Sequence, residues 1–378
     1  MNPTPSAGGE RLLEGLGIAV VGNFAPKGSG IFYQQEVLVD DFTAEGATCV
    51  PVTYQRNRFL RPFATAAELF RHRGRYRVLC CQGFSNWNWI NSAFAIATAK
   101  MLKKPITMVY RGGGFAAFAA RAPWTVLPFL RRVDLLIVPS GYLHREFEKH
   151  GLRHRIIPNV IELDGWPYRR RERLAPKLLW VRHIRPGYNP WMAVEVLQRI
   201  RQRHPDATLT MAGDGNMEEE MRRRLGAENV QGVEMVGHLP LAELRELFAA
   251  GDIFINTTNV DNQPRSVMEA MACGLPVVST NVGGVPFLID HRVQGLLVPP
   301  RDPDAMAAAV LELLDDPALG RRLADAAIEM VRSFSWKKSR YLWRQVYEDA
   351  GVVPRATTHA PGDPATPSAD AAEKRVAD

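Results

Sequence analysis

Two acidic residues, Asp261 and Glu269, stand eight positions apart in the stretch DNQPRSVMEAMACGLP. Asp261 lies in a polar segment broken by proline, whereas Glu269 lies just inside a run with helical spacing. Ionised carboxylates in such places can accept hydrogen bonds from the hydroxyls of a bound sugar. Ser266, three residues before Glu269, also fits a capping box, with Ser266 as N-cap and Glu269 at N3. The stretch by itself is therefore compatible with a ligand site or with a helix cap.

The position of this helix favours the ligand site. It follows an apolar strand, DIFINTT, in a chain whose short strands alternate with helices, as in parallel sheets. Ligands of such sheets bind beyond the carboxyl ends of the strands. The backbone N–H groups of Ser266, Val267 and Met268 would form a partly positive helix start suited to phosphate. Phosphate held by amides and hydroxyls held by carboxylates together describe a sugar nucleotide.

The strand pattern runs through the chain twice, which predicts an α/β fold of two Rossmann-like, doubly wound domains. We expect these domains at residues 1–165 and 166–335, joined near the basic, proline-containing segment 162–176. A helix at 336–350 follows, and the Pro-, Ala- and Thr-rich residues 351–378 are expected to be disordered. The predicted strands are GIAVV, CVPVTY, RVLCCQG, PITMVY and DLLIV, then LLWV, ATLTMAG, VEMVG, DIFINTT, PVVST and GLLVPP.

Composition limits the class of protein. A chain of 378 residues with 46% hydrophobic and 23% charged residues is typical of ordinary globular proteins. No uninterrupted apolar run is long enough to cross a bilayer, and no secretory signal precedes the first strand. The four cysteines lack metal-ligand spacing, which indicates buried thiols and a cytoplasmic location.

Several segments resemble one known family. DNQPRSVMEAMACGLPVVSTNVGGVP and QGLLVPPRDPDAMAAAV resemble the donor-binding region of the family-4 retaining glycosyltransferases of GT-B fold, the glycosyl transferases group 1. LTMAGDGNMEEEMRR, VEMVGHLP, IIPNVIEL and the late FSW also match landmarks of that family. The resemblance implies two Rossmann-like domains facing an interdomain cleft, with the acceptor on the N-terminal domain and the donor on the C-terminal one. The helix from about Trp336 would cross back to the N-terminal domain.

The resemblance also implies roles for individual residues. Glu269 would bind the ribose hydroxyls, Asp261 would hold hydroxyls of the transferred sugar, and Gly237 and His238 would lie beside the base. In the stretch WVRHIRPGYNP, the family's diphosphate-binding Arg and Lys fall on His183 and Tyr188. Arg182 or Arg185 would then supply the charge, since a buried diphosphate needs a compensating cation.

Two glycine-rich segments of the first half belong to the same expectation. The loop APKGSGIF would let backbone amides approach the phosphates, and a plain turn is the alternative. Arg111, in VYRGGG, would pair with phosphate or with a sugar oxygen. The predicted catalytic residues are Arg111, Arg182, Arg185 and Asp261. The predicted nucleotide-sugar ligands are Gly28, Ser29, Gly30, Gly213, Gly237, His238, Arg265, Ser266, Val267 and Glu269.

The expected reaction is sugar transfer from a UDP- or GDP-sugar to an acceptor hydroxyl, with retention and without a metal or another cofactor. The motif DPD at 302–304 resembles the Asp-x-Asp of metal-dependent transferases, but its position at a helix start favours helix capping. A non-catalytic GT-B partner protein and a GT-B epimerase or phosphorylase remain alternatives, because Tyr188 replaces the family's Lys and Arg111 stands near its usual His.

The basic charge gathers in the first half of the chain. Residues 1–165 contain 20 Lys and Arg against 12 Asp and Glu, whereas residues 166–350 are balanced. The segment RFLRPFATAAELFRHRGRYR mixes aromatic and Arg side chains. This pattern fits solvated helix faces or attachment to an anionic membrane, where a lipid-linked or saccharide acceptor would be met. No nucleic-acid motif accompanies it. We expect a cytoplasmic protein, peripheral on the inner face of the plasma membrane.

Overall fold

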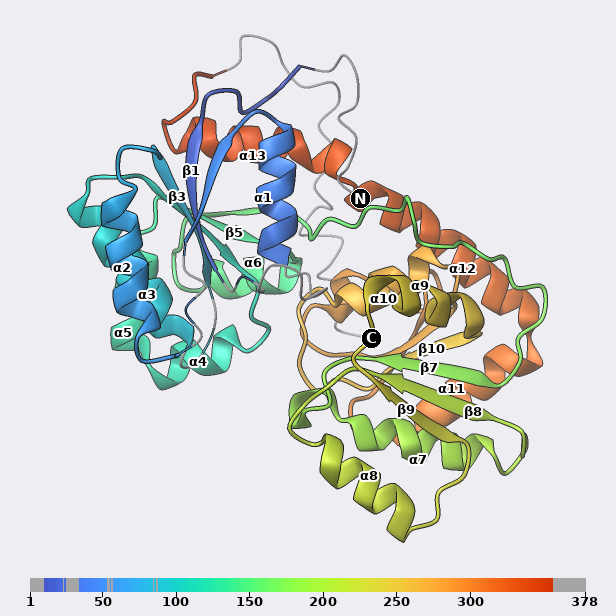
Figure 1. Cartoon of the computed structure of the whole chain (residues 1–378). Coiled ribbons are helices and arrows are strands. Elements are labelled where there is room, and N and C mark those ends of the chain that lie inside the picture. Colours follow the sequence, from blue (N-terminus) through green and yellow to red (C-terminus); the bar gives the residue numbers. More distant parts are fainter. Residues whose placement is uncertain are drawn as a thin grey trace. The chain divides into compact units, whose positions relative to one another are not determined.

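The computed structural model describes residues 10–22, 24, 34–52, 55, 57–83, 85 and 88–355. Contacts divide the chain into two units, which we call unit 1 (Met1–Pro158 and Trp336–Asp378) and unit 2 (Asn159–Ser335). Each unit is built on one parallel sheet with six described strands (Figure 1).

Unit 1 has the strand order β2-β1-β3-β4-β5-β6, all parallel. Its strands are β1 (Gly17–Val21), β2 (Thr48–Val52), β3 (Val78–Gly83), β4 (Ile106–Tyr110), β5 (Leu135–Val138) and β6 (His154–Ile156). Its helices are α1 (Gln34–Ala44), α2 (Arg61–Arg71), α3 (Asn88–Met101), α4 (Phe115–Arg121), α5 (Pro123–Leu130), α6 (Gly141–Glu148) and α13 (Trp336–Asp349).

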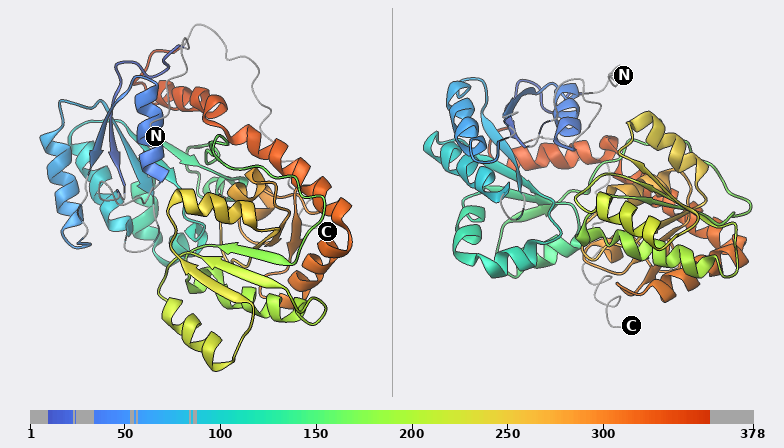
Figure 2. Two further views of the ribbon diagram at one scale, coloured as in Figure 1. Left: turned by 45° about the vertical axis from the view of Figure 1, so that its right-hand side comes forward. Right: turned by 60° about the horizontal axis from the view of Figure 1, so that its bottom comes forward.

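The sheet of unit 1 is buried on both faces, as parallel sheets are. One core combines strand side chains with those of α2 to α6, for example Leu69, Ile96 and Phe147. The opposite core combines them with α1 and α13, where Phe42 packs edge-on against Trp343 at a centroid distance of 5.0 Å. The two views of Figure 2 show the helices of unit 1 on both sides of its sheet. Strands β1, β3, β4 and β5 are therefore buried along their whole length.

The last described residues belong to this second core. Val352 is buried, and its backbone N–H donates to the carbonyl of Tyr347 at 3.0 Å. The prediction of disorder from residue 351 is thus wrong for residues 351–355, because a single valine after α13 finds an apolar place against the sheet. The rest of that predicted tail lies outside the described residues.

Unit 2 has the strand order β12-β11-β10-β7-β8-β9, again all parallel. Its strands are β7 (Lys177–Val181), β8 (Thr208–Ala212), β9 (Val233–Gly237), β10 (Ile253–Asn256), β11 (Val277–Thr280) and β12 (Leu296–Val298). Its helices are α7 (Pro190–Ile200), α8 (Glu218–Ala227), α9 (Leu241–Ala250), α10 (Arg265–Ala272), α11 (Pro303–Asp315) and α12 (Pro317–Val331), with 3-10 turns η1 (Pro186–Tyr188), η2 (Val285–Phe287) and η3 (Arg332–Phe334).

Helices cover both faces of this sheet as well. Side chains of α7, α8 and α11 build the core on one face, those of α9 and α10 build it on the other, and α12 contributes to both. Figure 1 shows α9 and α10 on one side of the strands and α7 and α11 on the other. The chain reverses its direction of winding between β7 and β10, which are adjacent in the sheet but far apart in sequence. Loops after these two strands therefore open onto a shared crevice at the carboxyl edge.

All eleven strands predicted from the sequence are present, and β6 was missed because its three residues carry one apolar side chain. The boundary between the units falls after Pro158 rather than after residue 165. The reason is local: the backbone N–H of Asn159 donates to Gln263 Oε1 at 2.6 Å, and Trp166 is buried in a unit 2 core.

A buried arginine closes the carboxyl ends of α9 and α10. Only 2% of the Arg171 side chain is exposed. Its guanidinium donates to the carbonyl of Cys273 at the end of α10 (2.8 Å) and to those of Phe248 (3.1 Å) and Gly251 (2.7 Å) at the end of α9. Cationic donors satisfy the last carbonyls of a helix and favour its negative end. Burial lowers the pKa of Arg171 to about 10, which leaves it charged at neutral pH.

Replacing Arg171 by leucine should lower the free energy of unfolding by about 3 kcal/mol, because buried carbonyls and Asp252 lose a charged partner. Arg170→Leu is the matched control, since the neighbouring Arg170 is exposed and its ion pairs are long. It should cost no more than about 1 kcal/mol. Guanidinium titration followed by tryptophan fluorescence measures both variants. Equal losses would contradict the capping role of Arg171.

Candidate functional site

The predicted donor-site residues of unit 2 follow consecutive strand ends. Arg182 comes directly after β7, Gly213 after β8, His238 after β9, and Asp261 stands on the loop between β10 and α10. Because these strands are parallel, all four positions lie at one edge of the sheet. The structure thus collects residues that are separated by up to 79 positions in the numbering.

An ion pair joins the two sides of the reversal point. The Arg182 guanidinium contacts the Asp261 carboxylate, and only 13% of either side chain is exposed. Asp261 Oδ1 also accepts the backbone N–H of Asn262 at 2.9 Å. Burial lowers the pKa of Arg182, with Tyr188 and Glu269 opposing the shift. Its buried Nε has no hydrogen-bond partner within the described part of the chain.

The aromatic ring of Tyr188 stacks against the guanidinium of Arg182. The Arg182 guanidinium lies 4.3 Å from the centre of the Tyr188 ring, a cation–π distance. The backbone at Tyr188 is held by Thr257, whose hydroxyl lies 2.9 Å from the carbonyl oxygens of Tyr188 and Asn189. Trp180 Nε1 donates to that same hydroxyl at 2.9 Å. Buried contacts of β7 and β10 therefore fix where the aromatic ring presents its face.

Two glycines let the backbone approach these charged residues. Gly213 has φ +133°, and a Cβ on it would overlap the carbonyl oxygen of Arg182. A Cβ on Gly284 would overlap the carbonyl oxygen of Asn262, next to Asp261. The backbone N–H of Gly284 donates to the carbonyl of Asp261 at 3.0 Å. Glycine is therefore required on the strand loops that flank both members of the ion pair.

Helix α10 begins differently from the capping-box interpretation. Its N-cap is Pro264, which places Ser266 inside the first turn, and no side chain caps the helix start. The hydroxyl of Ser266 is buried without a hydrogen-bond partner in the described residues. The capping interpretation of Ser266 and Glu269 is thus wrong, because the helix starts two residues earlier than the pattern indicates. The first-turn N–H groups of Arg265, Ser266 and Val267 are left to be satisfied by other means, such as a bound anion.

Glu269 is a buried carboxylate surrounded by arginines. It is 8% exposed, and Arg265 Nε donates to its Oε1 at 2.8 Å. Burial raises the pKa of Glu269, while Arg265, Arg182 and Arg245 oppose that rise. Such a group is costly to keep charged, and a cap on a solvated helix start does not need to be buried. Its placement is therefore typical of a binding residue.

A surface hollow of about 200 Å³ lies beside the ion pair. It is lined by Val181, Arg182, His183, Tyr188, Ala212, Gly213, His238, Leu239 and Leu244. The lining combines apolar side chains, an aromatic ring and one buried cation, as small-molecule sites do. Three predicted residues, Arg182, Gly213 and His238, share this hollow.

Other predicted residues lie elsewhere. Arg185 is exposed, and His183, also exposed, is 2.8 Å from Asp214 Oδ1. Arg111 belongs to unit 1, where its Nη1 donates to Gln82 Oε1 at 3.3 Å. Gly237 ends β9 with φ +73° and pairs with Ala212. The loop residues Gly28, Ser29 and Gly30 lie outside the described residues.

The Asp-Pro-Asp motif is a helix start, as predicted. Asp302 is the N-cap of α11 and accepts the backbone N–H of Ala305 at 2.8 Å. Among the described residues, no three His, Cys, Asp or Glu side chains are grouped so that they could hold a metal ion. Within the same part of the chain, no helix combines the length and the apolarity that crossing a bilayer requires.

Sequence reasoning missed two contributors to this site. Tyr188 was noted only as the replacement of a lysine, and its stacking under Arg182 has no local sequence signal. Asn159 and Gln263 form two hydrogen bonds, Asn159 N to Gln263 Oε1 (2.6 Å) and Asn159 Nδ2 to the Gln263 carbonyl (3.2 Å). They hold the loop before α10, although they are 104 positions apart.

Comparison with known proteins identifies the family of this chain. A family model described as glycosyl transferases group 1 matches residues 175–316. Glycogen synthase from Mycobacterium tuberculosis is 31% identical over 276 residues, covering 69% of this chain and 67% of the relative. The chain belongs to the group 1 glycosyl transferases. Sulfoquinovosyl transferase SQD2 from Arabidopsis thaliana is 27% identical over 268 residues, covering 64% of this chain and 51% of the relative.

Solved structures show that this group 1 glycosyltransferase has the GT-B fold. Sucrose-phosphate synthase from Thermosynechococcus elongatus superimposes with a TM-score of 0.70 at 18% identity, covering 88% of this chain and 98% of that chain. Anabaena HepE in complex with UDP-glucose gives a TM-score of 0.68 at 15% identity, covering 88% of this chain and 99% of that chain. The predicted fold class, two Rossmann-like α/β domains, is confirmed.

Glu269→Gln should change stability in a pH-dependent way. The folded protein holds the Glu269 proton more tightly than the unfolded chain, whose pKa is near 4.5. The stability that the protonated carboxyl contributes is therefore complete below that value and is lost as pH rises through the folded pKa. Relative to the glutamine variant, the wild-type protein should be most stable at low pH and lose this advantage toward pH 8.

Urea titrations from pH 4.5 to 8 measure the difference in the free energy of unfolding. Glu219→Gln, an exposed carboxylate on α8, is the control and should stay within about 0.5 kcal/mol of the wild type. A difference that moves in favour of wild-type Glu269 as pH rises would contradict the assignment, because it would show a carboxylate stabilised in its charged form.

Proposed function

We propose that this group 1 glycosyltransferase moves a sugar from a nucleotide diphosphate-sugar to an acceptor hydroxyl, with retention at the anomeric carbon and without a metal. The observation that carries the proposal is the buried cluster of Arg182, Asp261 and Glu269 at the start of α10, beside the unit 2 hollow. The relatives named above are glycogen synthase and SQD2, a sulfoquinovosyl transferase. HepE, which shares the fold, has been solved with UDP-glucose.

The donor would lie along the carboxyl edge of the unit 2 sheet. Its diphosphate would meet the first-turn amides of α10 and the Arg182 guanidinium, which combine backbone dipoles with a full charge. Glu269 would accept the ribose hydroxyls, and Asp261 would accept hydroxyls of the transferred sugar. The base, from a UDP- or GDP-sugar, would occupy the hollow beside Gly237 and His238.

Binding of the donor would change the partners of one ion pair. Arg182 and Asp261 neutralise each other in the described structure. A diphosphate would draw the guanidinium, and sugar hydroxyls would donate hydrogen bonds to Asp261, so neither charged group would be left without a polar partner. Tyr188 stands where the family's lysine is expected, and Arg182, which stacks on its ring from the end of β7, would supply the cation instead.

Transfer would break the bond from the anomeric carbon to the β-phosphate oxygen and form a bond to the acceptor oxygen on the same face. The acceptor proton would pass to the leaving phosphate. Charge therefore develops on the diphosphate, where Arg182 and the helix start are fixed in advance.

In unit 1, Arg111 and the loop of Gly28, Ser29 and Gly30 would contribute further groups. The acceptor would be a saccharide or a lipid-linked saccharide, and the product a polysaccharide or a glycolipid. Arg265, through its bond to Glu269, would orient the ribose ligand.

Two variants with matched controls test donor binding. Glu269→Gln should weaken binding of the nucleotide sugar about 10- to 100-fold, because a charge-assisted hydrogen bond is lost. Arg182→Gln should lower kcat/KM about 100-fold or more. Glu219→Gln and the exposed Arg185→Gln should leave both quantities within about twofold.

Calorimetry with UDP- and GDP-sugars followed by a transfer assay measures them, and melting temperatures confirm folding. Normal donor binding by Glu269→Gln, with loss of stability alone, would overturn the proposed site. Donor binding without turnover in the wild type would identify a non-catalytic partner protein, and release of an epimerised free sugar would identify an epimerase.

Transfer activity should survive excess EDTA, since Arg182 and the α10 start are proposed to neutralise the diphosphate. The measurement is the initial rate before and after chelation, with a Mn²⁺-dependent transferase as a positive control for metal removal. Activity that disappears with EDTA and returns with Mg²⁺ or Mn²⁺ would rule out the metal-free mechanism.

A further inference from the structure

The outer surface of α3 carries an exposed apolar stripe. Ile90, Phe94, Ala97 and Met101 are all exposed, and their spacing of four, three and four places them on one helix face. Met101 is 72% exposed. A helix on the surface of a globular unit normally presents polar side chains outward, whereas α3 carries apolar side chains on its outer face as well as on its buried one.

The neighbouring helix α2 extends the same surface. Phe63 (65% exposed) and Phe70 are seven positions apart on its outer face, and the exposed Phe59 and Leu60 precede its first turn. The rings of Phe63 and Phe94 touch edge-on at a centroid distance of 5.4 Å. Thr65 Oγ1 donates to Asn91 Oδ1 at 2.7 Å beneath them. We call this surface the α2–α3 face; its large apolar residues are Phe59, Leu60, Phe63, Phe70, Ile90, Phe94 and Met101.

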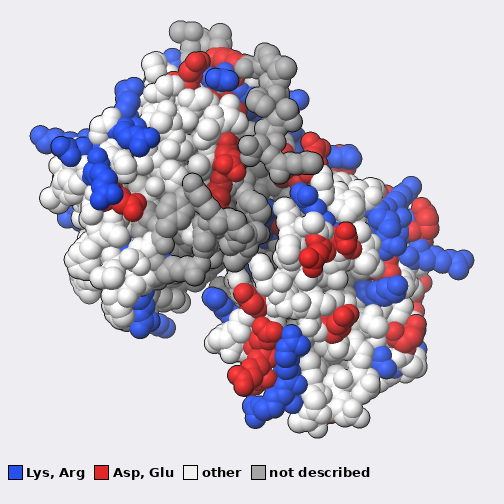
Figure 3. Space-filling view, viewed as in Figure 1, with Lys and Arg blue, Asp and Glu red and all other residues white. Residues whose placement is uncertain are grey.

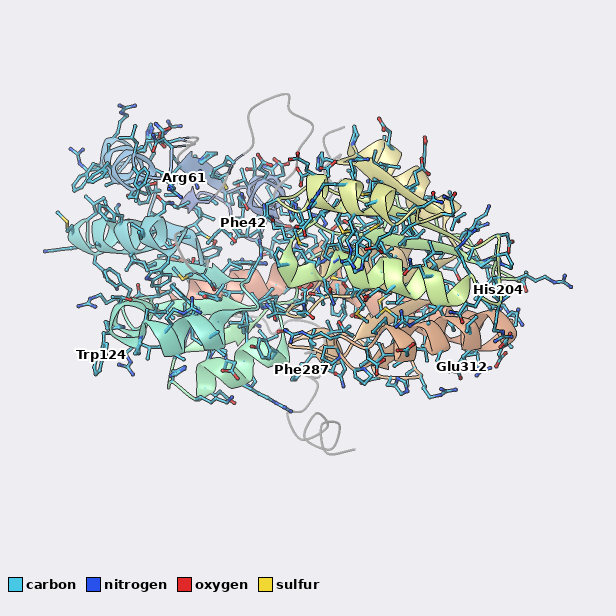
Figure 4. All side chains as sticks on the ribbon, turned by 90° about the horizontal axis from the view of Figure 1, so that it is seen from below. Phe42, Arg61, Trp124, His204, Phe287 and Glu312 are labelled. Carbon is cyan, nitrogen blue, oxygen red and sulfur yellow. The ribbon has the colours of Figure 1, made fainter. Side chains whose placement is uncertain are left out.

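A third helix adds an exposed tryptophan on the same side of unit 1. Trp124, in the first turn of α5, is 89% exposed. Figure 4 shows Trp124 and Arg61 of α2 on the same outer side, with α3 between their helices. Trp89 of α3 packs edge-on against Phe129 of α5 at a centroid distance of 6.5 Å, which ties the helices together. The α2–α3 face therefore continues toward an aromatic side chain that is almost fully exposed.

Positive charge surrounds this apolar surface. Residues 55–104, which include α2 and α3, contain ten Lys and Arg but one acid, Glu68. Three exposed arginines accompany α2: Arg58 precedes it, Arg71 ends it and Arg73 follows it. Figure 3 shows Lys and Arg side chains gathered on the part of unit 1 that Figure 1 labels α2 and α3. The face thus combines apolar side chains with a basic rim.

We propose that the α2–α3 face docks unit 1 onto an anionic lipid membrane. Aromatic and aliphatic side chains would enter the headgroup region, where amphipathic rings such as that of Trp124 are stable. The arginines would lie over anionic headgroups, which attract basic residues near the surface. Contiguous exposed apolar surface of this kind marks an interaction site rather than ordinary solvent exposure.

The charge favours a membrane over the other occupants. A second copy of the chain would bring the same basic rim against itself, and like charges across an interface oppose association. Single-stranded nucleic acid could contact the aromatic rings and the arginines of the α2–α3 face. The aliphatic side chains of Leu60, Ile90 and Met101 on the same face offer its bases no stacking surface. An anionic membrane complements both the apolar and the basic parts of the face.

Vesicle flotation of the full chain tests this docking. Vesicles of phosphatidylcholine alone are compared with vesicles containing about one third phosphatidylglycerol, at 0.05 and 0.5 M NaCl. Binding should require the anionic lipid and weaken with salt. The variant Phe63→Ser/Met101→Ser should reduce partitioning tenfold or more, whereas the control Val293→Ser/Tyr341→Ser, which removes two exposed apolar side chains elsewhere, should leave it unchanged.

The charge contribution has its own matched pair. Arg58→Gln/Arg71→Gln should weaken partitioning about 30-fold, since each basic residue at an anionic surface contributes about a fivefold factor. Arg223→Gln/Arg322→Gln removes two exposed arginines from unit 2 and should have little effect. Melting temperatures identify any variant that fails to fold, and single substitutions at Phe63 and Trp124 then replace it.

Three results would overturn the proposal. The wild-type protein could remain unbound with anionic vesicles at low salt, or the α2–α3 variants could bind as well as their controls. Sedimentation could instead show a dimer that Phe63→Ser/Met101→Ser dissociates, with no vesicle binding, which would assign the face to a second copy. Binding of single-stranded DNA that competes with vesicles and exceeds them in affinity would assign it to nucleic acid.

Discussion

The ion pair between Arg182 and Asp261 holds together the loops that form the candidate site of unit 2. It joins the loop after β7 to the loop after β10, two strands that are neighbours only because the sheet reverses its winding there. Both side chains are nearly buried, and a buried charge is tolerated only with a partner. The pair therefore holds these two loops together. It also places a cation and a carboxylate at the edge where ligands of such sheets bind.

The residues around this pair fix the course of the backbone, either by allowing two loops to approach closely or by hydrogen bonding to backbone carbonyls. Gly213 and Gly284 allow loops to pass where a Cβ would overlap a carbonyl oxygen. Trp180 and Thr257 hold the chain at Tyr188, whose ring carries the Arg182 guanidinium. Arg171 closes the ends of α9 and α10 by donating to their last carbonyls. Helix α10 is thus satisfied at its carboxyl end, whereas its start presents amides and the buried, unpartnered hydroxyl of Ser266 among the described residues.

The two units of this group 1 glycosyltransferase differ in what they expose. Unit 2, residues 159–335, contains 20 Lys and Arg against 24 Asp and Glu, so it has no basic excess. Unit 1 presents an apolar, basic surface on α2 and α3. A donor is a small polar molecule recognised by a few fixed groups, whereas a membrane is recognised by area and charge. This contrast agrees with the two proposals made above, that unit 2 binds the donor and that unit 1 docks onto a membrane.

The sequence by itself determined the fold class, because strand and helix periodicities and turn residues are local signals that survive without tertiary information. Eleven of the twelve described strands, the capping role of Asp302 and the placement of Asp261 and Glu269 beyond a strand end all follow from such signals. Only the tertiary structure decided between Arg182 and Arg185 as the buried cation, put Tyr188 under it, and removed Ser266 from the cap position. The outward direction of Phe63, Phe94 and Met101 also became visible only there. In each case the deciding contact joins residues that are distant in sequence or depends on which face of a helix the sheet covers, and neither is written in local composition.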